Sequence, residues 1–139
     1  MRLVLDTNTA ISALLWHGTP GKLIDAAQSK TFSLFSSAPL LAELRGALLR
    51  EKFAKQLKTK GLMPDEIADG YAALVSIVTP AVIRPAIAHD PPDDVVLATA
   101  LAAQADLIVS GDADLLNLKT YQGIPIVGPA EALARLPQR

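Results

Sequence analysis

Two short apolar runs, each followed by an acidic residue, constrain the fold of this chain more than any other feature. Residues 3–5 (LVL) precede Asp6, and residues 107–110 (LIVS) precede Gly111 and Asp112. A short run without charged residues is typical of a strand covered on both faces, as in a parallel sheet. Because ligands collect beyond the carboxyl ends of such strands, we expect Asp6 and Asp112 to lie at the same edge of a sheet.

The rest of the chain alternates between strand and helix patterns. Strands are predicted at residues 3–5, 32–36, 82–84, 107–110 and 124–127. Helices are predicted at residues 9–16, 22–29, 40–58, 64–78, 95–105, 113–118 and 130–136. This alternation predicts an α/β fold, a three-layer α/β/α sandwich with a mostly parallel central sheet. The length of 139 residues suits a single domain over residues 1–139.

The composition limits the kinds of site that the chain can build. There is no cysteine, which excludes disulfides, iron–sulfur clusters and zinc sites made of thiolates. His17 and His89 are the only histidines, so we expect a bound metal to be held mainly by oxygen, as Mg²⁺ and Mn²⁺ are. The net charge of −1 gives no overall attraction to nucleic acid.

Nothing in the sequence points to a membrane. No apolar stretch is long enough to span a bilayer, and the N-terminus lacks the layout of a signal peptide. We therefore expect a cytoplasmic protein with no membrane partner. Half of the residues are hydrophobic, so we also expect part of the apolar surface to meet a partner or a second copy of the chain.

Acidic residues stand at or near several ends of the predicted elements. Taken singly, each has a structural explanation as a helix cap, a turn residue or a solvated helix flank. These residues are Asp6, Glu43, Asp93, Asp94 and Asp112. In a doubly wound sheet they can also converge at one rim, where two carboxylates about 4 Å apart repel by about 4 kcal/mol at a dielectric constant of about 20. A divalent cation removes this repulsion, so convergence predicts a metal site.

Five sequence segments occur in the order seen in one known family. They are LVLDTN, Glu43 within ELR, DPPDD leading into VVLATALAAQAD, LIVSGDADLL and GIPIVGPAEAL. With this order and spacing from residue 3 to about residue 133, the chain resembles the PIN domain (PilT N-terminus) nucleases. This family includes the toxin ribonucleases of VapBC-type toxin–antitoxin pairs, and the likeness is greatest to its branch of toxin components.

The resemblance implies a metal-dependent endoribonuclease that hydrolyses RNA phosphodiesters with Mg²⁺ or Mn²⁺. The residues that match the family's catalytic, metal-binding quartet are Asp6, Glu43, Asp94 and Asp112. The resemblance further implies the toxin component of a type II toxin–antitoxin pair. Its expected partners are the RNA substrate, a small antitoxin whose peptide covers the acidic site, and a second copy in a homodimer.

Four further residues match supporting positions of the family. Asn8 matches an amide that holds a neighbouring carboxylate by a hydrogen bond, and Ser110 falls where the family usually has Thr or Ser near the metal. Asp93 is adjacent to the quartet residue Asp94. Helix phase favours Asp94 over Asp93 as the metal ligand, and a contribution of Asp93 to the metal site stays open. Asp114 is an additional acid in the same loop as Asp112.

Basic residues gather between positions 45 and 60. They are Arg45, Arg50, Lys52, Lys55, Lys58 and Lys60, against Glu51 as the single acid. This stretch is either a solvated helix face or a patch that follows RNA phosphates, with Arg45 nearest the metal and with Arg50 and Lys52 beside it. The aromatic content of 4% argues against extensive base stacking.

Three other functions fit the sequence less well. A haloacid-dehalogenase-like phosphohydrolase is suggested by DTNT, but Asn8 stands where its second Asp belongs and Leu116 interrupts its later acidic motif. A phosphoacceptor receiver domain needs a lysine after the last strand, where this chain has Gly128 and Pro129. A catalytically inactive module that binds nucleic acid or antitoxin remains the alternative from a different class, against which the intact acidic set argues.

Overall fold

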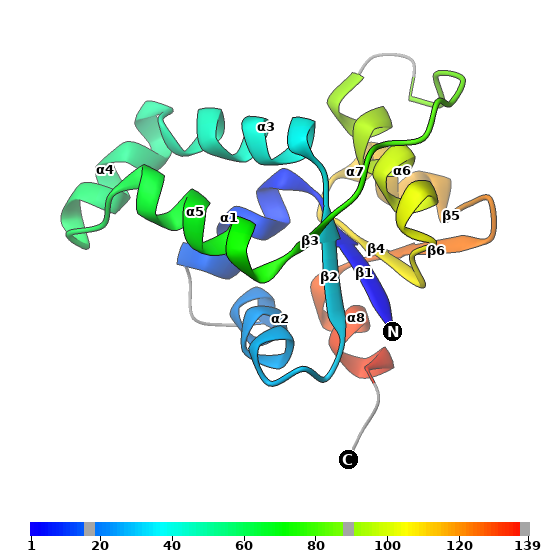
Figure 1. Ribbon diagram of the computed structural model, residues 1–139, viewed down its shortest axis with the longest axis horizontal. Coiled ribbons are helices and arrows are strands. Elements are labelled where there is room, and N and C mark those ends of the chain that lie inside the picture. Colours follow the sequence, from blue (N-terminus) through cyan, green and yellow to red (C-terminus); the bar gives the residue numbers. More distant parts are fainter. Residues whose placement is uncertain (16–18, 88–90, 137–139) are drawn as a thin grey trace.

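The computed structural model describes residues 1–15, 19–87 and 91–136, so His17 and His89 lie outside the described residues. The strands are β1 (Arg2–Leu5), β2 (Ser33–Ser36), β3 (Ser76–Ile77), β4 (Leu107–Val109), β5 (Thr120–Tyr121) and β6 (Ile124–Val127) (Figure 1). The helices are α1 (Thr7–Leu15), α2 (Thr19–Gln28), α3 (Ala38–Leu48), α4 (Glu51–Thr59), α5 (Pro64–Leu74), α6 (Pro91–Ala103), α7 (Ala113–Leu118) and α8 (Pro129–Arg135).

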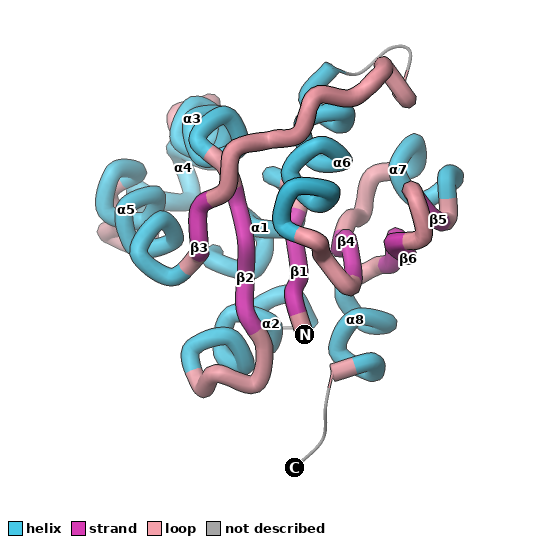
Figure 2. The backbone as a smooth tube through the Cα atoms, turned by 45° about the vertical axis from the view of Figure 1, so that its right-hand side comes forward, coloured by secondary structure: helices cyan, strands magenta, loops and turns pink. Residues whose placement is uncertain are grey.

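The strands form one sheet in the order β3-β2-β1-β4-β6-β5, which can be followed from left to right in Figure 2. All neighbours are parallel except β5 and β6, which form an antiparallel pair at one edge. Leu3 in β1 pairs with Leu34 on one side and with Leu107 on the other. The carboxyl ends of β1 and β4 therefore lie side by side at the centre of the sheet.

Successive residues of the central strands point to opposite faces, and helices cover both faces. Leu3 and Leu5 belong to a core cluster built with residues of α1, α2, α3, α5 and α8. Val4 and Ile108 belong to a second cluster, built mainly with α6 and α7. The predicted three-layer α/β/α sandwich with a mostly parallel sheet is confirmed. The longest helix that the structure describes, α6, has 13 residues, too few to cross a membrane.

The prediction of one helix over residues 40–58 is wrong, because the chain breaks between α3 and α4. Arg50 has extended backbone angles at the N-terminal end of α4. At about 100° per residue, an unbroken helix would place Phe53 and Leu57 about 180° and 220° from the buried Leu44, facing solvent. The break turns both toward the core, where Leu57 is 1% exposed and Phe53 is partly buried.

The edge of the sheet also differs from the prediction. The helix expected to reach residue 78 ends at Leu74, and β3 pairs with β2 instead, because Ile77 and its neighbours suit a strand. No strand forms at residues 82–84, which lie between Pro80 and Pro85, and Val82 is fully exposed. Proline supplies no N–H to a sheet. The short strand β5 was not predicted.

Five helices begin earlier than the sequence pattern predicts, namely α1, α2, α3, α6 and α8. Among them, α1 begins at Thr7 rather than at residue 9, and α6 begins at Pro91 rather than at residue 95. The second shift matters for the site, because it places Asp93 and Asp94 inside the first turn of α6. The direction of each side chain is then set by the rotation of the helix against the sheet.

Candidate active site

An acidic pocket of about 200 Å³ lies at the carboxyl ends of β1 and β4. Among the described residues, four carboxylates line it, and each comes from a different segment of the chain. They are Asp6 after β1, Glu43 in α3, Asp93 in α6 and Asp112 after β4. The structure therefore brings together three members of the sequence-predicted quartet and one acid that was predicted as supporting.

Asp6 is buried, and its carboxylate is held on both oxygens. The hydroxyl of Ser110 donates to Oδ2 at 2.5 Å, and the backbone N–H of Thr9 donates to Oδ1 at 2.8 Å. Burial raises the pKa of Asp6, and the nearby charge of Asp112 raises it further, while the two hydrogen bonds oppose the shift. The side chain is thus fixed in direction but is costly to keep charged without a compensating cation.

Ser110 connects the two strand-end acids. It is fully buried, donates to Asp6, and accepts a hydrogen bond of 2.9 Å from the backbone N–H of Asp112. Asp112 in turn caps α7, where its Oδ2 accepts from the backbone N–H of Leu115 at 3.1 Å. These bonds hold both carboxylates at the sheet edge with little rotational freedom.

Asp93, rather than Asp94, lines the acidic pocket. Asp94 points elsewhere, and its Oδ1 accepts from the backbone N–H groups of Ala86 and Ile87 at 3.0 and 2.8 Å. Asp94 therefore anchors the segment that precedes α6. The structure therefore differs from the prediction, based on helix phase, that Asp94 rather than Asp93 faces the site.

A signal for Asp93 is present in the sequence. The buried residues of α6 that pack toward the sheet include Val96, Leu97 and Ala100. These follow Asp93 by three, four and seven positions, which places them within about 60° of it around the helix. Asp93 therefore shares the face that meets the sheet.

Asp114 adds a further acid beside the pocket. It is exposed, and one carboxylate oxygen from each of Asp93, Asp112 and Asp114 lies within 4.8 Å of the others. Of the residues described, Arg50 is the one basic side chain lining the pocket, against four acids. The hydroxyl of Thr7, also in this lining, is buried without a hydrogen-bond partner among the described residues. A donor set of carboxylate and hydroxyl oxygens fits a hard divalent cation.

Asn8 lies at the mouth of the acidic pocket, where it is exposed. Its side chain makes no hydrogen bond to a carboxylate within the described part of the chain, where Ser110 and the backbone of Thr9 hold Asp6 instead. Asn8 and Asp112 also line an adjoining pocket of about 340 Å³.

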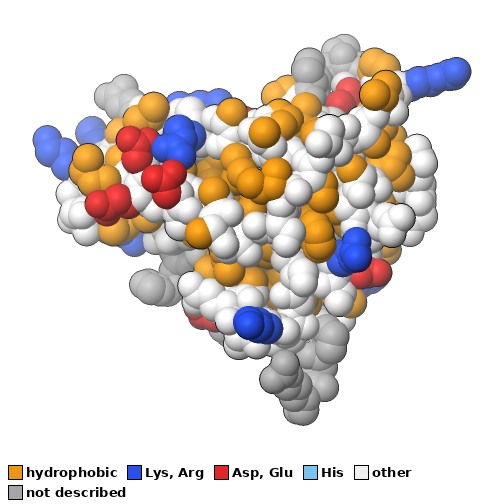
Figure 3. Space-filling model, viewed as in Figure 1, with side chains coloured by type: hydrophobic (Ala, Val, Ile, Leu, Met, Phe, Trp, Pro, Cys, Tyr) orange, Lys and Arg blue, Asp and Glu red, His pale blue; other side chains and the backbone are white. Residues whose placement is uncertain are grey.

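The basic residues of the 45–60 stretch face different ways. Arg45 makes ion pairs with Asp65 at 2.6 Å and Asp69 at 2.7 Å on α5, and Figure 3 shows basic and acidic side chains together over α3 and α5. Arg50 is the one that reaches the acidic pocket. Lys52 is exposed, with its Nζ 5.3 Å from the centre of the Phe53 ring.

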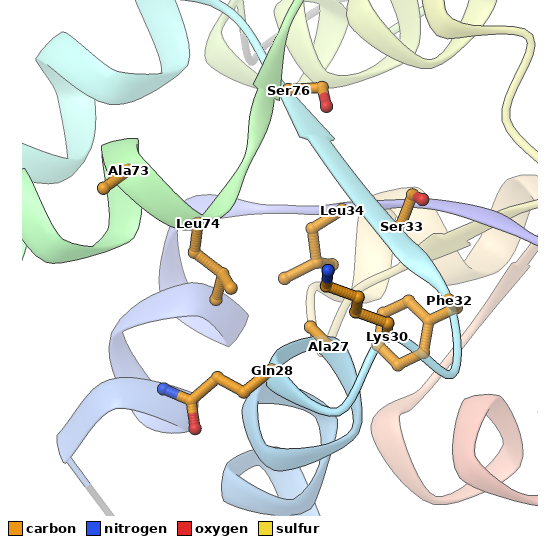
Figure 4. Close-up of a pocket in the computed structure, with 9 residues that line it drawn as sticks. All are labelled: Ala27, Gln28, Lys30, Phe32, Ser33, Leu34, Ala73, Leu74 and Ser76. Atoms are coloured by element: carbon orange, nitrogen blue, oxygen red, sulfur yellow. The ribbon is translucent and has the colours of Figure 1, made fainter.

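A different pocket, of about 370 Å³, lies away from these acids (Figure 4). Leu34, Phe32 and Leu74 line it, and Lys30 is the one charged side chain among its described lining residues. The part of the chain that the structure describes places no acidic side chain and none of the sequence-predicted site residues in its lining. The chemistry expected from the sequence therefore belongs to the acidic pocket.

Comparison with known proteins agrees with this geometry. The family model of the PIN domain matches residues 2–114, which include all four acids of the pocket. No curated protein matches the sequence. The fold is similar to a chain in the crystal structure of VapBC2 from Rickettsia felis bound to a DNA fragment from their promoter. The TM-score is 0.56 at 16% identity, covering 91% of this chain and 97% of that chain. The match over most of its length means that the chain belongs to the PIN domain family.

Proposed function

We propose that this protein is a metal-dependent endoribonuclease, and that it is the toxin component of a type II toxin–antitoxin pair. The observation that carries the proposal is the convergence of Asp6, Glu43, Asp93 and Asp112, from four separate segments, in one pocket. Membership of the PIN domain family, whose members are nucleases, supports the same activity. Its substrate is the phosphodiester backbone of RNA.

The same four acids are the proposed ligands of Mg²⁺ or Mn²⁺, with Asp114 beside them. A bound ion of this kind supplies a water molecule of lowered pKa and positive charge that stabilises a phosphoryl group. The role of the protein is to fix the positions of the carboxylates. Ser110 donates to the carboxylate of Asp6 and accepts from the backbone N–H of Asp112, while the backbone N–H of Leu115 holds the Asp112 carboxylate.

The proposed partners are a small antitoxin protein and a second copy of the chain. The similar solved structure is that of a VapBC2 complex, which supports a partner of the antitoxin type. Large hydrophobic side chains are exposed at Leu49, Met63, Ile77 and Val82. Figure 3 shows hydrophobic side chains spread over one face of the molecule. Exposed apolar area of this kind suits protein–protein contact. We place the protein in the cytoplasm, where its proposed substrate lies.

Cleavage of a total RNA pool tests the nuclease activity. Purified protein is expected to cut RNA with Mg²⁺ or Mn²⁺ and to stop when a chelator is added. Asp6→Asn keeps the size of the side chain but removes its charge, so we expect the cleavage rate to fall by about 100-fold or more. Equal residual cleavage by the wild type and Asp6→Asn would instead indicate a contaminant and favour an inactive binding module.

Arg50 is expected to contribute to RNA binding, and Arg45 is not. Arg50 lines the acidic pocket, whereas the guanidinium of Arg45 is engaged by two carboxylates of α5. We expect Arg50→Ala to weaken binding of single-stranded RNA by about 3- to 10-fold and to reduce the slope of log K against log salt by about 1. Arg45→Ala is the matched control, and fluorescence anisotropy at several salt concentrations measures both. Equal losses in the two variants would contradict this assignment.

A further inference from the structure

The pocket that adjoins the acidic one has a different chemical character. It measures about 340 Å³ and meets the acidic pocket at Asn8 and Asp112, which line both. Beyond these two shared residues, it is lined by Thr9 and Ser12 of α1, by Gly111 and Ala113 around the start of α7, and by Pro129. The two pockets are therefore neighbours along one surface, with Arg50 in the acidic one only.

The charge of this second pocket argues against a phosphate as its occupant. Among the described residues that line it, Asp112 is the one charged side chain and none is basic. A phosphate placed there would lie next to a carboxylate without a counter-charge, which costs free energy. An uncharged group that forms hydrogen bonds is a better match.

The size and polar groups of the pocket fit a nucleoside. Its volume of about 340 Å³ is in the range of small-molecule sites. The amide of Asn8 and the hydroxyl of Ser12 can both donate and accept hydrogen bonds, as the edges of bases and the ribose 2′-hydroxyl require. The described residues that line the pocket include no aromatic side chain, so recognition by them would rest on hydrogen bonds and shape rather than on stacking.

We propose that this pocket binds the nucleoside next to the phosphodiester that is cut. The inference rests on the proposed ribonuclease function and adds the direction in which the RNA strand crosses the site. The RNA strand runs from a nucleoside held between α1 and the start of α7, across Asp112 and Asn8, to phosphates near Arg50. Asn8 and Ser12 are specificity-determining residues in this arrangement, and they set which base is accepted beside the cleaved bond.

Two substitutions fill the pocket without removing an acid. Ala113 is exposed at the start of α7, so Ala113→Leu places a larger side chain there at little cost to folding. Gly111→Leu is a second variant, since a Cβ on Gly111 meets no heavy atom within 4 Å. Ala73→Leu is the matched control, because Ala73 is an exposed helical alanine lining the distant pocket of about 370 Å³ (Figure 4).

Binding of a short, labelled single-stranded RNA in the presence of Ca²⁺ measures the effect separately from cleavage. We expect Ala113→Leu and Gly111→Leu to weaken binding by about 10-fold, and Ala73→Leu to leave it unchanged. Abasic substitution at each nucleotide in turn should reveal one position where loss of the base weakens wild-type binding. The same abasic RNA should bind Ala113→Leu no more weakly than the complete RNA does, because the pocket is already closed to that base.

The outcomes separate this inference from the nuclease proposal. Metal-dependent cleavage by the wild type, together with unchanged RNA binding by both pocket variants, would overturn the nucleoside pocket and leave the ribonuclease standing. The nucleoside pocket would also be overturned if the loss of binding caused by the abasic nucleotide added to the loss caused by Ala113→Leu at every position. The pocket would then hold no particular base. If the wild type neither binds nor cuts RNA, both proposals are wrong.

Discussion

Replacing Asp93 with asparagine is expected to slow RNA cleavage by about 100-fold or more, whereas Asp94→Asn is expected to stay within about 3-fold of the wild type. The two residues are adjacent in sequence, but only Asp93 lines the acidic pocket. Loss of its charge removes one of four carboxylates proposed to hold the metal, and a 100-fold effect corresponds to about 2.7 kcal/mol. In Asp94→Asn the amide oxygen can still accept the two backbone hydrogen bonds from Ala86 and Ile87.

Thermal unfolding gives a second measurement for the same pair that does not depend on activity. A ligand that binds only the folded state raises the unfolding temperature. We expect Mn²⁺ to do so for the wild type and for Asp94→Asn, and to have a much smaller effect on Asp93→Asn. The assignment would be contradicted if Asp94→Asn lost both cleavage and the response to Mn²⁺ while Asp93→Asn kept them.

Leu97→Ala is expected to lower the free energy of unfolding by about 2–5 kcal/mol. Leu97 is 0% exposed and belongs to the same core cluster as Val4 of β1 and Ile108 of β4. Truncation removes buried methyl groups and leaves a cavity between α6 and the sheet. Because domains are typically stable by only about 5–15 kcal/mol, this single change would remove a large fraction of the total.

Chemical denaturation of the apoprotein measures this effect, and the unfolding temperature should fall by about 4 to 20 °C. Leu49→Ala is the matched control, since Leu49 is 63% exposed between α3 and α4. We expect the control to change stability by less than about 0.5 kcal/mol. A change of less than about 0.5 kcal/mol in Leu97→Ala would mean that α6 does not pack on the sheet as described.

The central strands and the two acids at their ends could be predicted from local sequence. An unbroken apolar run such as residues 3–5 has few alternatives to a buried strand, so the ends of β1 and β4 carry Asp6 and Asp112 where the pattern predicts. Glu43 is identified through its match to the family's acidic quartet, because a glutamate on a helix flank is by itself more often solvated. The positions of β3 and β5 were not predictable, since two-residue strands carry too little pattern.

The choice between neighbouring side chains depended on the tertiary structure. Arg45 is drawn to α5 by acids 20 and 24 positions away, and Arg50 is left facing the pocket. Packing of the buried face of α6 on the sheet likewise turns Asp93, and not Asp94, toward the other acids. Neighbouring residues of a helix point in directions about 100° apart.

Local sequence therefore determined which elements form and which acids stand near their ends, because the spacing of hydrophobic residues is a local property of the chain. Long-range packing decided where each helix begins and which way its side chains point, because only contacts with distant segments determine that rotation.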